Sequence, residues 1–179
     1  MSADAAPLAE NASPEDPSVG EELPTFRMGE FLAKFPTDRA YCRNHLWLLT
    51  TDRQEGGEPI YRVGFTAYSR RLLQDVYFLD WNVDEGQTVD AGASIGEIES
   101  AKALSSMHPP AAGTIVTLNP APLADPSVIN AAGYDAEDGG GWLYEFATAA
   151  PLLDAAAYVD HLGGVWETTQ RIIKGQANT

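Results

Sequence analysis

Short runs of alternating apolar and polar residues fill the middle of the chain, from residue 41 to residue 118. Trp47 and Leu49 share one face of the first run. Beyond the turn at 52–59, one face of the next run carries three apolar side chains: Tyr61, Val63 and Phe65. Apolar and aromatic residues then follow one another at 76–81. Because alternation with a period of two is typical of half-buried strands, the pattern predicts a mainly β domain.

Residues 119–141 interrupt this pattern, since they are rich in Pro, Ala, Asp and Gly. They predict a long loop. After the loop, alternation resumes and places three aromatic side chains on one face of a last strand: Trp142, Tyr144 and Phe146.

Helical spacing appears first near the N-terminus, where apolar residues recur at i, i+3, i+4 and i+7: Met28, Phe31, Leu32 and Phe35. This spacing predicts a short amphipathic helix that ends at Pro36. A second short helix is predicted over residues 67–73, because the Thr66 side chain can cap its first turn.

A C-terminal helix is predicted after Pro151. Its apolar residues step by threes and fours along one stripe: Val159, Leu162, Trp166, Thr169 and Ile173. Gly163 and Gly164 predict a break or kink within this helix.

The first 25 residues are rich in Pro, Ala and acidic residues and contain no Lys or Arg. Little there can offset the entropy of ordering, so we expect a disordered tail. The segment has neither the basic and apolar regions of a secretory signal nor the arginines of a mitochondrial transit peptide, and we expect a cytoplasmic protein. The predicted organisation is a tail over 1–25, a β domain with its short N-terminal helix over 26–153, and a helical extension over 154–179.

Composition excludes several classes of protein. Among 179 residues the formal net charge is −15, and such a surface repels the phosphates of nucleic acids. No apolar run is long enough to span a bilayer, so we expect no membrane insertion. The single cysteine, Cys42, excludes an internal disulfide, and we interpret it as a packing residue.

One stretch combines hairpin spacing with an unusual lysine. Residues 95–113 read I-G-E-I-E-S-A-K-A-L-S-S-M-H-P-P-A-A-G, and Lys102 at the centre is flanked by Ala101 and Ala103. Small neighbours leave a lysine at a hairpin tip free for another protein to bind. A solvated turn lysine fits the same residues, and the chain has only three lysines against eight arginines.

Four motifs decide between these two interpretations: E-S-A-K-A from Glu99, P-x-x-G-T-I-V-T-L-N from Pro110, D-P-S-V-I-N from Asp125 and G-W-L-Y from Gly141. In this order they resemble the H-protein family of the glycine cleavage system, a family of lipoate carriers. The resemblance implies a lipoyl/biotinyl-type flattened barrel (barrel-sandwich hybrid) with short flanking helices and a C-terminal helix. It also implies covalent lipoate on Lys102, with Glu99, Ser100, Ala101 and Ala103 as the recognition context.

The resemblance further implies a monomeric carrier that catalyses nothing itself. In the family's reaction, glycine decarboxylase (P protein) loads an aminomethyl group onto the arm. Aminomethyltransferase (T protein) then passes the one-carbon unit to tetrahydrofolate, and dihydrolipoyl dehydrogenase (L protein) reoxidises the arm. A lipoate ligase or transferase attaches it. A tether lets one carrier visit these active sites in turn.

Two positions depart from the family pattern. The acid of the family's H-E-W motif is Leu46 here, and the acid usually four residues beyond the lysine is Ser106. Carboxylates near the arm would hold an amine cargo, so their loss weakens the expectation of aminomethyl transport but not of lipoylation. Asn44 and His45 offer polar contacts there, although His45 fits a structural role equally well. An H-like carrier for another redox complex (sulfur oxidation or lipoate relay) stays open, as does a binding module without lipoate.

Other chemistries fit the residues poorly. A biotin carrier is expected to read A-M-K-M, whereas this chain reads S-A-K-A. The three histidines, His45, His108 and His161, show no metal-ligand spacing, and we expect no metal site. No catalytic pair of Cys42 with a histidine is indicated.

Overall fold

The computed structural model describes residues 22–177. Residues 1–21, which make up most of the predicted tail, lie outside the described part, and the boundaries of the three predicted segments stay predictions. None of the helices that the structure describes is both long enough and apolar enough to cross a membrane.

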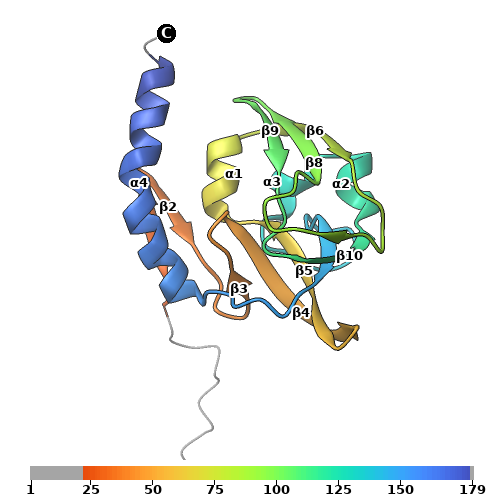
Figure 1. Ribbon diagram of the computed structural model, residues 1–179. Helices are drawn as coiled ribbons and strands as arrows, with labels where there is room; N and C mark the ends of the chain where they lie inside the picture. The colour runs from red at the N-terminus through yellow and green to blue at the C-terminus, as the bar shows by residue number, and fades with distance from the viewer. Residues whose placement is uncertain (1–21, 178–179) are drawn as a thin grey trace, which may run out of the picture.

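Two antiparallel sheets form the body of the molecule (Figure 1). The larger has six strands in the order β3-β4-β5-β11-β10-β7: β3 (Ala40–Tyr41), β4 (Leu46–Glu55), β5 (Glu58–Phe65), β11 (Tyr144–Ala147), β10 (Gly113–Leu118) and β7 (Thr88–Val89). The smaller has three in the order β6-β8-β9: β6 (Val76–Trp81), β8 (Gly96–Ser100) and β9 (Leu104–Met107).

The main hydrophobic core lies between these sheets. Val63, Ile115 and Phe146 come from the larger sheet, and Ile98 and Met107 come from the smaller. All five are at most 5% exposed. Alternate residues of each strand therefore face a shared interior, which confirms the predicted flattened barrel.

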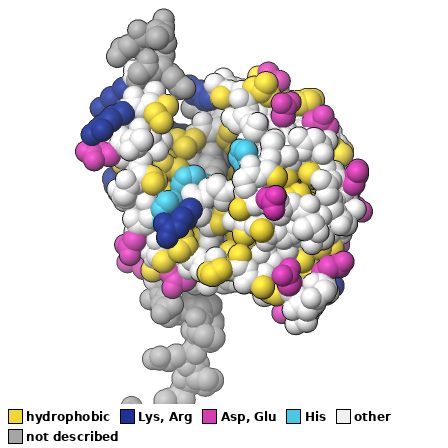
Figure 2. Space-filling view, viewed as in Figure 1, with side chains coloured by type: hydrophobic (Ala, Val, Ile, Leu, Met, Phe, Trp, Pro, Cys, Tyr) yellow, Lys and Arg dark blue, Asp and Glu magenta, His cyan; other side chains and the backbone are white. Residues whose placement is uncertain are grey.

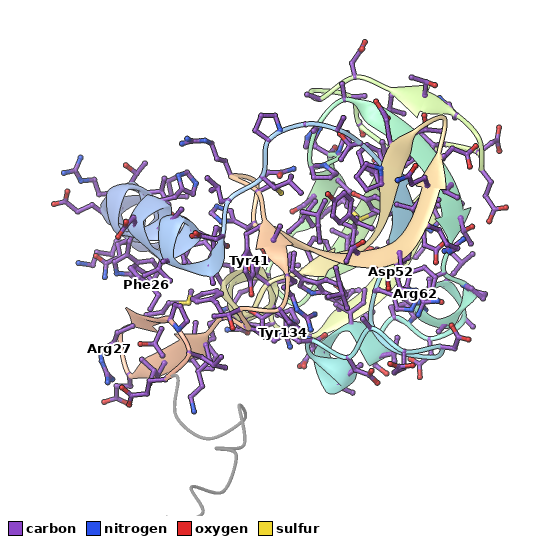
Figure 3. The ribbon with its side chains drawn as sticks, turned by 90° about the horizontal axis from the view of Figure 1, so that it is seen from below. Phe26, Arg27, Tyr41, Asp52, Arg62 and Tyr134 are labelled. Carbon is purple, nitrogen blue, oxygen red and sulfur yellow. The ribbon has the colours of Figure 1, made fainter. Side chains whose placement is uncertain are left out.

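A second core lies outside the barrel and is mostly aromatic. It joins the barrel to the hairpin β1–β2 (Thr25–Met28 and Phe31–Lys34) and to the C-terminal helix α4 (Ala155–Ala177). The Tyr158 ring of α4 stacks on Tyr41 at 4.9 Å between centroids and meets Phe35 edge-on at 5.2 Å. Phe26 lies beneath α4, 5.9 Å from the Trp166 ring, whereas Arg27 points away (Figure 3). Offset and edge-on aromatic pairs of this kind add stability beyond the area they bury.

The predicted N-terminal helix is wrong. Residues 25–34 form two antiparallel strands in which Met28 pairs with Phe31, so Gly29 and Glu30 make a two-residue turn. Gly29 has φ +65°, a conformation that favours glycine and the tight hairpin turn. The helical spacing arises by coincidence, since Met28 and Ala33 are buried while Leu32 is 39% exposed.

The predicted break in the C-terminal helix is also wrong, because α4 runs without interruption through Gly163 and Gly164. Each glycine costs a helix about 1 kcal/mol relative to alanine. Packing of Leu162 and Trp166 on either side offsets this cost.

The segment predicted as one long loop, residues 119–141, contains two short helices instead: α2 (Pro120–Ala124) and α3 (Val128–Ala132). The last strand is likewise shorter than predicted. Tyr144 and Phe146 face the main core, but Trp142 precedes the strand and packs in the second core. The helix α1 (Ala67–Leu73) is confirmed, with the Thr66 hydroxyl accepting the Ser69 N–H.

Candidate functional site

Lys102 lies at the tip of the hairpin that joins β8 to β9. Ser100, which is 3% exposed, fixes this turn. Its hydroxyl accepts the N–H groups of Lys102 (3.3 Å) and Ala103 (3.4 Å), and its own N–H donates to the Ala103 carbonyl at 3.0 Å. The Ala101 N–H donates to the Asp75 carbonyl at 2.9 Å, which anchors the tip beside the start of β6. Lys102 itself is exposed, as predicted for a residue that another protein must reach.

Glu99 lies on the outer face of the small sheet, one residue before Ser100. Its carboxylate accepts the Tyr77 hydroxyl at 3.4 Å, a weak contact at the solvent-exposed edge. The predicted recognition context is therefore contiguous: Glu99, Ser100, Ala101 and Ala103 surround Lys102 within one turn.

A cleft of about 920 Å³ opens beside Lys102. Helices α1 and α4 form one wall, with Leu72, Trp166 and Ile172, and the inner side of the small sheet forms the other, with Ile98 and Met107. Figure 2 shows the surface hollowed between α4 and the barrel, with histidine side chains on both sides. The apolar lining suits a long uncharged chain attached to Lys102.

The two positions that depart from the family pattern both line this cleft. Leu46 is only 3% exposed and also belongs to the main core, whereas Ser106 is exposed on β9. Among the described residues, no Asp or Glu lines the cleft, although Lys102 and Arg71 do. The cleft is therefore apolar to weakly basic and offers no carboxylate to an amine.

Tyr144 adds one uncommitted polar group to the lining. It is 1% exposed, and its hydroxyl has no hydrogen-bond partner among the described residues. Burial raises the pKa of Tyr144 well above its ordinary value, so the hydroxyl stays protonated and can donate. Buried polar groups are normally paired, so this hydroxyl is an exception in the wall of the cleft.

His45 is a structural residue. Its Nδ1 lies 2.9 Å from the Tyr158 hydroxyl, which in turn lies 3.0 Å from the Thr66 hydroxyl, and its ring packs on Tyr68 at 4.6 Å. Burial, with a smaller effect of the neighbouring His161, lowers the pKa of His45 to about 4. The ring is therefore neutral at pH 7.

This shift predicts a pH dependence of stability. The unfolded chain takes up a proton on His45 near pH 6.5, whereas the folded chain does so only near pH 4. Between these values the unfolded state binds more protons, so the free energy of unfolding falls as the pH is lowered, by up to about 3 kcal/mol. Urea unfolding at pH 7.0 and at pH 4.5 measures this fall in the free energy of unfolding. In His45→Asn, which tolerates the residue's φ of 69°, the fall should be smaller; an equal fall in both proteins would contradict the assignment.

Asn44, His45 and His108 line the cleft beside Lys102, and the His161 ring stacks on His45 at 5.8 Å between centroids. The three histidines bind separate backbone carbonyls or the Tyr158 hydroxyl, and no cluster of three metal-ligating side chains occurs between residues 22 and 177. Cys42 is buried, and burial raises the pKa of its thiol to about 11, so it packs as predicted and is unreactive at neutral pH. Asn44 donates to the carbonyls of His108 and Pro109, which holds its loop against the segment after β9.

The chain is similar to known proteins in sequence and in fold. Residues 39–160 match the family described as glycine cleavage H-protein. A glycine cleavage system H protein of Beutenbergia cavernae is 40% identical over 125 residues, covering 69% of this chain and 92% of that protein. One from Micrococcus luteus is 31% identical and covers 73% and 98%. The crystal structure of such a protein from Mycobacterium marinum superposes with a TM-score of 0.60 at 35% identity, covering 72% of this chain and 99% of that one.

Proposed function

Because this chain belongs to the glycine cleavage H-protein family, whose members are lipoyl carriers, we propose that it carries a lipoyl group on Lys102 and presents it to partner enzymes. The observation that carries the proposal is the place of Lys102 on an exposed hairpin whose turn is fixed by buried Ser100. Lys34, at the end of a strand, and Lys174, on α4, lack such a turn.

The cleft fits the group that the family carries. A lipoyl arm is long and uncharged, and the cleft beside Lys102 is mostly apolar. When bound, the group supplies a disulfide–dithiol couple and a sulfur that accepts cargo. The chain's own residues would hold the arm on the surface between visits to active sites.

We further propose that the chain catalyses no step itself and that its partners do so. These partners are glycine decarboxylase, aminomethyltransferase and dihydrolipoyl dehydrogenase, together with a lipoate ligase or transferase, in the cytoplasm. The exposed lysine supports this division, because a tethered group needs access to several active sites in turn.

The decisive experiment is co-expression with a lipoate ligase and measurement of the intact mass. We expect an increase of one lipoyl group, located by peptide mapping at Lys102. The variants Lys34→Arg and Lys174→Arg should be modified as fully as the wild type. Modification at Lys34 or Lys174, or none at all, would overturn the proposal.

One observation favours a second candidate function, a carrier of this family that serves another redox complex. The cleft lacks carboxylates, among the residues described, to hold the amine of an aminomethyl cargo. A charge-assisted hydrogen bond contributes about 1.5–3 kcal/mol when shielded from water, and less in an open cleft.

If the missing carboxylates shorten the lifetime of an aminomethyl cargo on the isolated carrier, Ser106→Asp should lengthen that lifetime several-fold. Ser106 is exposed and tolerates a charge, whereas Leu46→Glu would bury a carboxylate at a position only 3% exposed. The measurement is release of formaldehyde and ammonia, with Ser106→Asn as the neutral control. Equal lifetimes for wild type and Ser106→Asp would remove the reason to favour the second candidate.

A further inference from the structure

The outer face of the small sheet carries a row of side chains beside Lys102, here named the outer row: the exposed Tyr77, Phe78 and Leu104 and the half-buried Glu99. We propose that the outer row is the docking surface for the enzyme that acylates Lys102. The inference depends on the proposed function, because it concerns how the same lysine is recognised.

The strand register brings the outer row together. Phe78 pairs with Glu99, and Glu99 pairs with Leu104, so three side chains lie side by side across β6, β8 and β9. Neighbouring strands are about 4.8 Å apart, which places them in contact distance on one face. A register shift between Val76 and Phe78 turns Tyr77 outward as well.

Exposure distinguishes the outer row from the rest of the surface. Leu104 is 63% exposed, Tyr77 58% and Phe78 43%. The other large exposed apolar residues described are scattered, with Leu23 and Leu32 near the N-terminus, Leu123 on α2 and Ile172 on α4. Single exposed apolar residues are ordinary, but several on one sheet face beside a modified residue indicate contact with another protein.

The outer row lies on the opposite side of the sheet from the cleft. Along β8 and β9 the inward-facing residues Ile98, Ser100, Ser105 and Met107 line the cleft, whereas Glu99 and Leu104 alternate with them and point outward. Ser106 pairs with Glu97 on the outward side and reaches the cleft only at its rim. Lys102 stands at the tip between the two faces. An enzyme on the outer face therefore leaves the cleft open to the arm that it attaches.

Steric reach identifies the acylating enzyme as the occupant. Amide formation takes place at Nζ of Lys102, on a four-carbon stem, so the enzyme must cover the hairpin tip and meet Leu104 two residues away. Enzymes that act on the far end of a completed arm work further from the surface. Two residues further along the same face, Asp80 pairs with Glu97, and both are exposed. The docking enzyme should therefore place basic side chains around an apolar centre.

The step that this docking serves is an acyl transfer. The Lys102 ammonium loses a proton, and Nζ attacks the carbonyl carbon of an activated acyl donor, an acyl adenylate or thioester. The N–C amide bond forms, the bond from that carbon to the donor's oxygen or sulfur breaks, and AMP or a thiol leaves. No oxidation or reduction is involved.

The test is the steady-state rate of acylation of the unmodified full chain by a lipoate ligase supplied with lipoate and ATP. We expect Leu104→Ser and Phe78→Ser to lower kcat/KM at least tenfold, mainly through KM for the carrier. Leu123→Ser is the matched control, since Leu123 is 49% exposed but lies on α2, and it should stay within twofold of wild type. Asp80→Asn with Glu97→Gln should weaken the dependence of the rate on salt.

A competition experiment separates docking from folding and chemistry. Lys102→Arg protein in excess should inhibit acylation of the wild type, and adding Leu104→Ser to it should raise the inhibition constant at least fivefold. Equal rates and equal inhibition for all variants would overturn the docking surface while lipoylation of Lys102 still stood. If the wild type is not acylated at all, the proposed function itself fails.

Discussion

Arginine in place of Lys102 should abolish lipoylation while leaving the barrel unchanged. The guanidinium stays protonated at any pH that the protein survives, so it cannot form the amide that a lysine amine forms. Lys102 is exposed and makes no ion pair among the described residues, so the substitution should shift the unfolding midpoint by no more than about 1 °C. Intact mass after co-expression with a lipoate ligase measures the first effect, and thermal unfolding measures the second.

The same variant should stop every reaction that depends on the arm. Glycine-dependent NADH formation in a mixture with the three proposed partner enzymes should fall to the level seen without carrier. Lys174→Arg, which changes a lysine of α4 in the same way, should keep full lipoylation and rate. Any lipoyl mass on the Lys102→Arg protein would show that another residue is the acceptor.

The largest expected effect on stability is that of Gly113→Ala. Gly113 begins β10, where an added Cβ would overlap the carbonyl oxygen of Ala147 and lie 2.6 Å from Cζ of Phe146. Both obstacles belong to the strand beside it in the core, so neither can move cheaply. We expect a loss of about 2–4 kcal/mol, which corresponds to roughly 5–15 °C in the unfolding midpoint.

Gly92→Ala is the matched control, because an added Cβ there would have no atom within 4 Å and the backbone needs no positive φ. Its midpoint should stay within about 2 °C of the wild type. If the two alanine variants unfold at the same temperature, the close approach of β10 and β11 is not a source of strain.

The local parts of the fold were predictable from the sequence. Alternation at residues 46–49 and 61–65 identified two strands of the large sheet, and Thr66 identified the start of α1. Prediction failed where tertiary contacts outweigh local spacing. Nothing in the spacing of Met28 and Phe31 shows that Gly29 turns the chain back, and nothing near Gly163 shows that α4 continues past the two glycines and packs on residues far away in the chain.

The exposed hairpin position of Lys102, which we propose as the attachment residue, was likewise predictable, because Lys102 and its neighbours form one continuous motif. The cleft was not, because its walls come from residues far apart in the chain, such as Leu46, Leu72, Tyr144 and Trp166. The acid positions of the family pattern gave a partial signal, since Leu46 and Ser106 both line the cleft. The exposure of Phe78 could not be predicted either, because residues 76–81 form a mostly apolar strand in which the sequence does not distinguish the two faces.

The packing of α4 on the hairpin β1–β2 has a consequence for biosynthesis. The hairpin leaves the ribosome before the whole barrel, while the helix that covers it is made after the last strand. Until Tyr158 and Leu162 are synthesised, the faces of Phe35 and Tyr41 that they cover stay open to solvent. The barrel can close on contacts made earlier, but the aromatic core must wait for α4. A nascent chain halted before residue 155 would therefore carry a finished barrel with an exposed aromatic flank, the kind of surface that chaperones and proteases recognise.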